Sequence, residues 1–420
     1  MKKSLLAVAA IGAFASAAQA QSSVTVYGIL DVGYVGNSAS GPATTGAIQG
    51  NGPSTQKVTN SSFGQSAEQS SRIGFKGTED LGGGTSAFFT AEFGLQPQGT
   101  TWAPNNRQSF VGLKKNGIGQ ASIGTQYTAL WMNALNPTDP GNGNNVAGNI
   151  IRPVGLSASQ DGQGAASTAV TILTTNSLYG ETARFAGFRL AANYVMNGQD
   201  ATQRTTAAVA TTPATATTNG KVGSAAAVTG GPNTFTGVSF SGDYTLNKLL
   251  VTAAYSNFKQ QQIQGAAGTF DPALAFPSTA VTVASTTNTS DTQYYGGATY
   301  DFGILKAYAN YVNRKIVDAN NSSKYLSRSG QQIGVRSYVT PVIEAWASAG
   351  LGRYQAFGAG EPTANVTAYQ LGANYYLSKR TNLYGIFGHS QTSSVNGSSI
   401  VGATAGSSIS GYALGLRHTF

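Results

Sequence analysis

Apolar and polar residues alternate along most of the chain, and a period of two is typical of a β-strand with one apolar face. Near the start, Val24, Val26 and Leu30 fall on one face, while Thr25 and Asp31 fall on the other. The same alternation predicts further strands at 72–78, 86–93, 188–196, 238–246, 249–258, 294–300, 304–314, 331–338, 343–351, 369–377, 381–389 and 410–420. Most of them approach the length of about 9–11 residues that a tilted strand needs to cross a bilayer.

The connections between these segments alternate between short and long. Short ones, such as 246–248 and 300–303, carry turn residues, whereas the long ones are rich in Gly, Ser, Thr, Asn and Ala and cover 36–70, 127–171, 198–233, 260–289 and 390–408. Outer-membrane barrels have this asymmetry, because their periplasmic turns are short and their extracellular loops are long. We therefore predict an all-β fold, a transmembrane antiparallel β-barrel of about 16 strands, wide enough to hold an aqueous channel.

The composition supports a barrel in lipid. Only 10% of the residues are charged, against roughly a quarter in ordinary soluble domains. Hydrophobic residues reach 40%, yet beyond the N-terminus no run approaches the ~20 apolar residues of a membrane helix. The chain has no cysteine, which excludes disulfides and thiolate metal sites. Half of each strand facing lipid would account for the sparse charge.

Both ends of the chain carry export signals. Lys2 and Lys3 precede an apolar stretch at 5–15, and an Ala-Gln-Ala sequence ends at Ala20, so we expect residues 1–20 to be a signal peptide. A single barrel domain would then occupy 21–420. Its formal net charge would be +7, because the whole chain carries +9 and the signal peptide removes Lys2 and Lys3. The last alternating segment ends on Phe420, which looks like the signal read by the outer-membrane barrel-assembly machinery.

Four stretches resemble the general porins of β-proteobacteria, of the Neisseria, Bordetella and Burkholderia type. They read SSVTVYG at 22–28, SRIGFKGTEDLGGG at 71–84, NRQSFVGL at 106–113 and GLRHTF at 415–420. This resemblance implies a homotrimer of 16-stranded barrels in the outer membrane. It also implies that the third extracellular loop, about 127–171, folds inward to form a constriction.

Charged residues are the candidates for the channel wall. Alternation alone places Arg72, Lys76 and Arg107 on the lumen side, and the resemblance assigns Arg72 and Arg107 to the constriction. The third loop contributes the acids Asp139 and Asp161. A basic wall opposite an acidic loop would set a transverse field at the narrowest point, where rings of charge control selectivity.

The chain also departs from the family pattern at the constriction. It has Gly-Thr-Gln at 124–126 where the family often has Gly-Arg-Gln, Tyr179 at a position that is frequently basic, and NPTDPGNG at 136–143 in the loop. These departures predict a pore that is larger or less strongly charged than in relatives with the full arginine set. Three further candidate lumen charges would partly compensate: Lys306, Arg314 and Arg336.

The predicted function is passive diffusion of ions and small hydrophilic solutes through a water-filled channel, with a mild anion preference. A substrate-specific channel and a barrel adhesin remain open as alternatives, since the long Ala- and Thr-rich segment at 201–230 suits an adhesin as well as a porin. The positive charge also has two interpretations, because basic residues at the rims would contact lipopolysaccharide. The other expected partners are outer-membrane lipids, two further copies of the chain, the assembly machinery and the permeating solutes.

Catalytic, cofactor and nucleic-acid signatures are missing from the sequence. The chain has only two histidines, His389 and His418, and no Gly-x-Ser-x-Gly elbow before a helix, so we do not expect an enzyme. Nothing in the sequence predicts a cofactor or a metal site. The basic residues are dispersed in an exported chain, so nucleic acid is not an expected partner.

Overall fold

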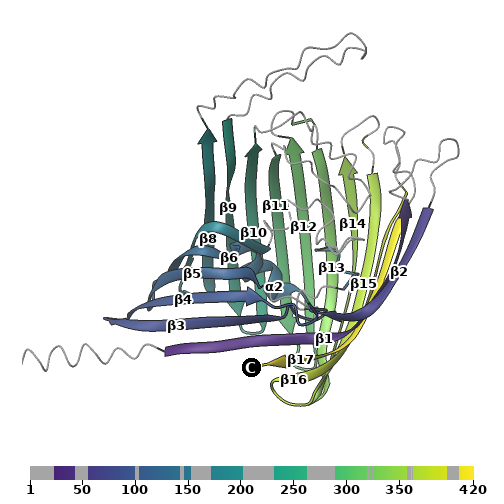
Figure 1. Cartoon of the computed structure of the whole chain (residues 1–420), viewed down its shortest axis with the longest axis horizontal. Helices are drawn as coiled ribbons and strands as arrows, with labels where there is room; N and C mark the ends of the chain where they lie inside the picture. The colour runs from purple at the N-terminus through teal and green to yellow at the C-terminus, as the bar shows by residue number, and fades with distance from the viewer. Residues whose placement is uncertain are drawn as a thin grey trace, which may run out of the picture.

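The computed structural model describes residues 23–42, 55–99, 104–141, 146–152, 172–201, 231–262, 289–318, 322–323, 325–356, 361, 363–394 and 406–420. These residues are almost entirely β-strand (Figure 1). The strands are β1 (Ser23–Pro42), β2 (Thr55–Gln65), β3 (Arg72–Gly82), β4 (Thr85–Gly94), β5 (Asn105–Lys115), β6 (Gly119–Tyr127), β7 (Leu173–Thr182), β8 (Phe188–Ala201), β9 (Gly231–Leu246), β10 (Leu249–Gln262), β11 (Thr289–Asp301), β12 (Lys306–Asp318), β13 (Tyr325–Thr340), β14 (Ile343–Ala356), β15 (Thr363–Tyr376), β16 (Thr381–Thr392) and β17 (Ser407–Thr419). Two short helical elements follow β6, namely the π-helical turn η1 (Leu130–Leu135) and α2 (Asn136–Thr138). Among the described residues, no helix is both long and apolar enough to cross a bilayer.

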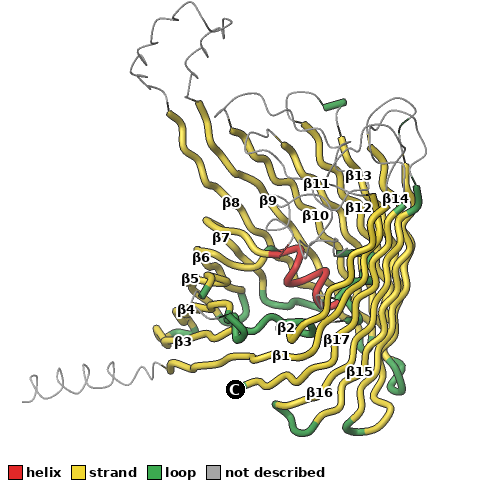
Figure 2. The backbone as a smooth tube through the Cα atoms, turned by 45° about the vertical axis from the view of Figure 1, so that its right-hand side comes forward, coloured by secondary structure: helices red, strands yellow, loops and turns green. Residues whose placement is uncertain are grey.

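The strands form one closed antiparallel barrel. Each strand from β3 to β17 pairs with the next along the chain, and β1 pairs with β17, which closes the ring. The two ends meet at Gly28 and Phe420, which exchange two backbone hydrogen bonds of 3.1 Å. Figure 2 shows the strands enclosing an interior in which the helical turn lies.

The partner of β1 is divided into two strands. The part of β1 from Val32 to Pro42 pairs with β2, and the part from Ser23 to Ile29 pairs with β3. The six residues Ser66 to Ser71 interrupt this partner strand, so β2 and β3 together fill one position and the barrel has 16 positions. The predicted loop at 36–70 is therefore wrong in part, because 36–42 and 55–65 are paired strand. Its polar sequence gives no alternating signal.

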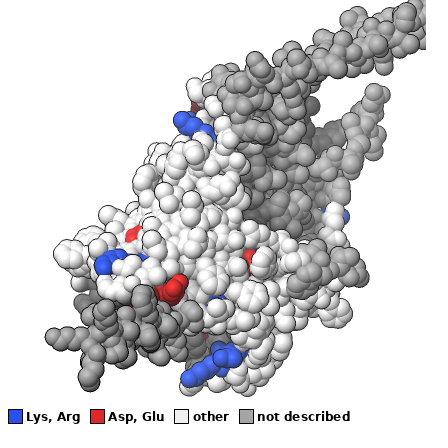
Figure 3. Space-filling view, turned by 60° about the vertical axis from the view of Figure 1, so that its left-hand side comes forward, with Lys and Arg blue, Asp and Glu red and all other residues white. Residues whose placement is uncertain are grey.

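The barrel is apolar outside and polar inside. In β15, Tyr369, Leu371 and Tyr375 are exposed, whereas Gln370 and Asn374 on the opposite face are buried. This is the reverse of a soluble sheet, where the apolar face is the buried one. The face seen in Figure 3 accordingly carries few charged side chains among its described residues.

The predicted strands end correctly at the short turns and too early at the long connections. Alternation predicts strands at 238–246 and 249–258, and the structure has β9 and β10, which keep the turn at 247–248 but begin or end several residues farther out. β11, β13, β14 and β15 extend in the same way. The extensions carry polar residues on both faces, which is consistent with strands that continue beyond the hydrocarbon.

Candidate pore constriction

The segment after β6 lies inside the barrel, along the wall opposite β3–β5. Its first half crosses the inner faces of β8 to β12. The backbone N–H of Ala129 donates to Asn193 Oδ1 on β8 at 2.9 Å, and that of Leu130 donates to Ser239 Oγ on β9 at 3.1 Å. At the end of α2, Asn310 on β12 donates from Nδ2 to the carbonyl oxygen of Thr138 at 3.0 Å. Side chains on successive strands of the wall thus form hydrogen bonds with the backbone of the loop.

The second described part of the loop, 146–152, continues along β13 to β17. Arg328 on β13 donates from Nη1 to the carbonyl oxygens of Ile150 and Ile151 at 2.7 and 3.1 Å. Gln370 on β15 donates from Nε2 to the carbonyl of Ala147 at 2.8 Å. Polar side chains of the inner wall, buried beneath the loop, therefore hold it in place.

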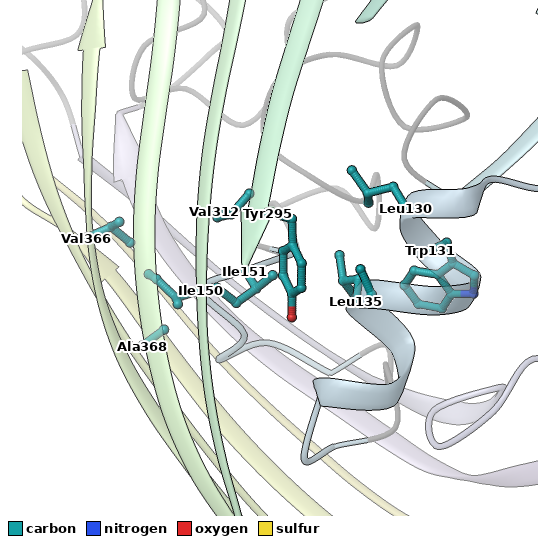
Figure 4. Close-up of a cluster of buried hydrophobic side chains, with 10 residues drawn as sticks. Leu130, Trp131, Leu135, Ile150, Ile151, Tyr295, Val312, Val366 and Ala368 are labelled. Carbon is teal, nitrogen blue, oxygen red and sulfur yellow. The ribbon is translucent and has the colours of Figure 1, made fainter. Parts of the chain in front are cut away.

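Apolar contacts fix the same segment. Leu130 and Leu135 from η1 pack with Ile150 and with Tyr295 of β11 and Val312 of β12, all of them buried (Figure 4). This cluster is the main apolar core of the described chain, and it lies between the loop and the wall. The lumen is consequently narrowed from the β8–β17 side.

Glycines in the strands make room for the loop. A Cβ atom added at Gly388 of β16 would lie 1.6 Å from the carbonyl oxygen of Ala147, and one at Gly350 of β14 would lie 2.5 Å from Ile150 Cγ2. Gly297, Gly334 and Gly411 meet loop residues in the same manner. We call these five glycines the glycine floor. They let the loop lie flat against the wall.

The opposite wall carries a basic cluster around one buried carboxylate. Glu92 on β4 accepts from Arg107 Nε at 2.8 Å and lies 3.9 Å from Arg72 Nη1, while Tyr27 donates to its second oxygen at 3.1 Å. Arg107 also donates from Nη2 to the hydroxyl of Tyr127 at 2.7 Å. The structure thus brings together two of the three predicted wall residues.

A β-bulge aims Arg107 at this cluster. The register between β4 and β5 pairs Glu92 with Gln108 and Phe93 with Asn106, which leaves Arg107 as the extra residue. Bulges re-aim a side chain in this way. Lys76, the third predicted wall residue, is exposed, and its Nζ lies 5.3 Å from the ring centre of Tyr27.

Of the two predicted loop acids, only Asp139 lies among the described residues. Asp139 is buried and accepts from the backbone N–H of Gly141 at 2.9 Å and from Asn149 Nδ2 at 3.0 Å, so its carboxylate organises the loop itself. Asp161 lies outside the described residues. The described part of the loop therefore presents no exposed carboxylate toward Arg72 and Arg107, and the predicted transverse field stays a prediction.

The remaining predicted lumen charges lie on β12 and β13. Arg314 is buried and paired with Asp291 of β11, with Nε 3.0 Å from Oδ1. Arg336 Nε lies 3.6 Å from Glu344 Oε1 of β14. Lys306 Nζ lies 5.2 Å from the ring centre of Tyr308.

Three comparisons relate this geometry to known proteins. A family model described as Gram-negative porin matches residues 7–394. The chain belongs to the Gram-negative porin family. An outer membrane porin protein of Bordetella pertussis is 31% identical over 208 residues, 48% of this chain and 49% of that protein, and a major outer membrane protein P.IB of Neisseria gonorrhoeae is 37% identical over 130 residues, 31% and 33% of the two chains. The aligned stretch thus spans about half the length of the first relative.

A solved structure matches over nearly the whole porin. An anion-selective porin from Comamonas acidovorans superposes with a TM-score of 0.62, covering 95% of this chain and 100% of that one at 22% identity. At this identity the likeness establishes the fold. The family and the closed barrel place this porin in the outer membrane.

A second basic cluster of the porin was not predicted. Arg184, between β7 and β8, and Arg189 on β8 both pair with Asp243 of β9, the latter at 2.7 Å between Nε and Oδ2. Arg189 faces inward by alternation, which is a usable sequence signal. The acid that completes the cluster lies 54 residues farther along, and no local pattern links the two.

Tyr179, one of the departures from the family pattern, joins loop and wall. It donates to Glu181 Oε2 at 2.8 Å and accepts from Asn133 Nδ2 of η1 at 3.1 Å. Tyrosine therefore supplies a contact to the loop where the family often has a basic residue.

The acids and bases of these clusters differ in exposure. Glu92 is 4% exposed, beneath Arg72 and Arg107 at 18% and 21%, and Asp243 is 1% exposed, beneath Arg184 and Arg189 at 38% and 28%. Arg314 and Asp291 are the exception, with the arginine buried. Around Glu92 the charge that remains accessible to solvent is therefore positive. At Asp243 the two guanidinium groups are also accessible, but Glu181, which is 20% exposed and lies 3.8 Å from Arg189 Nη1, offsets part of their charge. No group of three or more potential metal ligands occurs among the described residues.

Proposed function

We propose that this porin forms a water-filled channel for passive diffusion of ions and small hydrophilic solutes, with a mild preference for anions. The observation that carries the proposal is the unequal exposure of the charge pairs: two arginines stay accessible over each buried carboxylate at Glu92 and at Asp243. A permeating anion meets accessible guanidinium groups in both places, and charges that line a pore set ion selectivity.

The similar Comamonas acidovorans protein is described as anion-selective. Because the identity is only 22%, we infer the anion preference of this porin from its own arginines. Removing them is therefore the decisive test.

Reversal potentials across a planar bilayer in a KCl gradient measure the preference. We expect the unmodified porin to favour chloride and the double variant Arg72→Ala plus Arg107→Ala to lose most of that preference. A unit charge about 10 Å from an ion in water changes the local ion concentration about twofold, so low salt gives the largest effect. A clear cation preference that the double variant leaves unchanged would contradict the proposal.

The same recordings separate this function from the two alternatives. Conductance that rises in proportion to salt and closes in three steps is expected for a homotrimer of diffusion channels. Saturation by one solute would indicate a substrate-specific channel, and absence of conductance an adhesin. Trimeric porin structures among the structural neighbours, such as the trimer form of a Vibrio cholerae outer membrane protein, support the homotrimer.

The proposal includes the expected maturation and surroundings of the porin. Residues 1–20 are removed as a signal peptide, Phe420 is read by the barrel-assembly machinery, and the outer face contacts membrane lipid and lipopolysaccharide. We propose no catalytic role for any residue, because the polar side chains described above hold either the loop or the arginines in place.

A further inference from the structure

The outer face of β10–β14 contains an apolar groove of about 780 Å³. Most of the residues that line it are on the lipid-facing side of the alternation, and Tyr311, Ile333 and Leu351 among them are exposed. The groove therefore faces the surroundings of the barrel and is separate from the channel. Its volume is in the range of small-molecule sites.

The shape follows from the register of the strands. Ala298, Ala309, Ile333 and Ala349 form one row across β11–β14, and Gly296, Tyr311, Gln331 and Leu351 form the next row toward the loop ends. Small residues therefore occupy the floor between larger ones. A Cβ atom added at Gly296 would have no other atom within 4 Å, so the space above it is open.

A polar zone begins one row above the groove. Tyr294, Asn313, Ser329 and Arg353 lie in register there, and Tyr294 packs against Tyr255 of β10 at 5.1 Å between ring centres. Tyrosines gather at the membrane–water interface. This row therefore marks the interface, and the groove lies just inside the hydrocarbon.

Two basic side chains stand at that interface. Arg353 is two residues beyond Leu351 on β14, about 7 Å along the strand, and Lys315 of β12 is one row farther out. Both are exposed on the outer face, where Lys315 Nζ lies 4.5 Å from the ring centre of Tyr325. No outward-facing residue described in β10–β14 is acidic, and the nearby loop acid Glu361 accepts from Gln355 at 2.9 Å.

We propose that this groove binds an acyl chain of a phosphate-bearing lipid of the outer leaflet, with the phosphate at Arg353 and Lys315. The apolar floor matches the chain, and the two cations above it match the phosphate. Gln331, a polar side chain within the groove, lies between them, at the height of the ester or amide carbonyl where chain and head group join. The outer leaflet follows from the proposed function, because the long loops at this end of the strands are extracellular.

Native mass spectrometry of the detergent-solubilised porin tests this site, with phosphorylated lipid A as the probe. Filling the groove with Ala309→Phe plus Ala349→Phe, or with Gly296→Leu, should abolish retention of lipid A. Replacing Lys315 and Arg353 by Ser should weaken it about fivefold for each residue, and enzymatically dephosphorylated lipid A should bind the unmodified porin as weakly. Ala373→Phe on the outer face of β15, outside the groove, should retain lipid A normally.

Equal retention by the groove-filled variants and the Ala373→Phe control would overturn the site, as would equal binding of the dephosphorylated lipid. A change of oligomeric state on filling the groove, with lipid binding intact, would identify it as a protein interface and would also overturn the proposal. Conductance is recorded on the same samples and should not change. A porin that retains lipid A through this groove and conducts no ions would contradict only the proposed function.

Discussion

Glu92 determines how the arginines of the constriction wall are held. Its carboxylate takes hydrogen bonds from Arg107 and Tyr27 and lies near Arg72, so one buried acid orients three side chains from three strands. A carboxylate in such a position is hidden from the ion path by the groups it binds. It nevertheless offsets part of the field of the two arginines.

Replacing Glu92 by Gln is therefore expected to strengthen the anion preference. Glutamine keeps an acceptor for Arg107 but removes the negative charge, so local chloride should rise about twofold if the charge is about 10 Å from the ion path. Reversal potentials in a KCl gradient at low salt measure the change. Glu79→Gln, at an exposed site near the β3–β4 turn, is the matched control and should have no effect; a shift toward potassium in the Glu92 variant would contradict this account.

Single residues of the site differ in how far the sequence reveals them. Arg72 was predictable, because alternation fixes its face once the strand is recognised. The partnership of Arg107 with Glu92 was not, since it depends on a bulge that shifts the alternation by one residue. Asp139 is predicted as an acid of the constriction loop opposite the arginines, and only the folded loop reveals that Gly141 and Asn149 donate to its carboxylate.

At the scale of elements, the inward loop and the glycine floor are complementary in shape. Strand glycines normally weaken a sheet. Here the missing side chains leave space on the inner face of the wall where the loop passes, and Ala147, Ile150 and Thr138 fill that space. The sequence shows the glycines, but their purpose depends on which strands the loop crosses, a long-range fact that local pattern cannot supply.

Gly388→Val should push the loop away from β16 and into the lumen. Its Cβ would overlap the carbonyl of Ala147, and overpacking of this kind typically costs about 1–3 kcal/mol. We expect lower single-channel conductance, because moving the loop is easier than opening a closed barrel. Gly385→Val, on the same strand but the outer face, is the control. Equal conductance of the two variants would show that the loop does not rest on Gly388.

The whole molecule was more predictable than its parts. One lipid-facing apolar side repeated in most strands gives alternation, turn positions and barrel architecture directly from the sequence. The strand extensions and β2 are missed because water on both sides removes the pattern that lipid imposes. β5, β6 and β7 are also absent from the predicted alternating segments. Closure depends on a single pair of distant strands, β1 and β17, which no local signal connects.

This closure leads to a prediction about Phe420. Its ring packs over Gly28, where an added Cβ would lie 2.3 Å from Phe420 Cζ, and its backbone pairs with that glycine. The ring is still 42% exposed, so Phe420→Ala should lower stability by only about 1 kcal/mol. If Phe420 is also the assembly signal, insertion in cells should fall far more than this cost explains, while refolding from urea into detergent stays nearly normal. Heat-modifiable electrophoretic mobility measures folded barrel in both settings, with Phe420→Tyr as the control. Parallel, small losses in cells and in detergent would reduce Phe420 to a packing residue at the barrel seam.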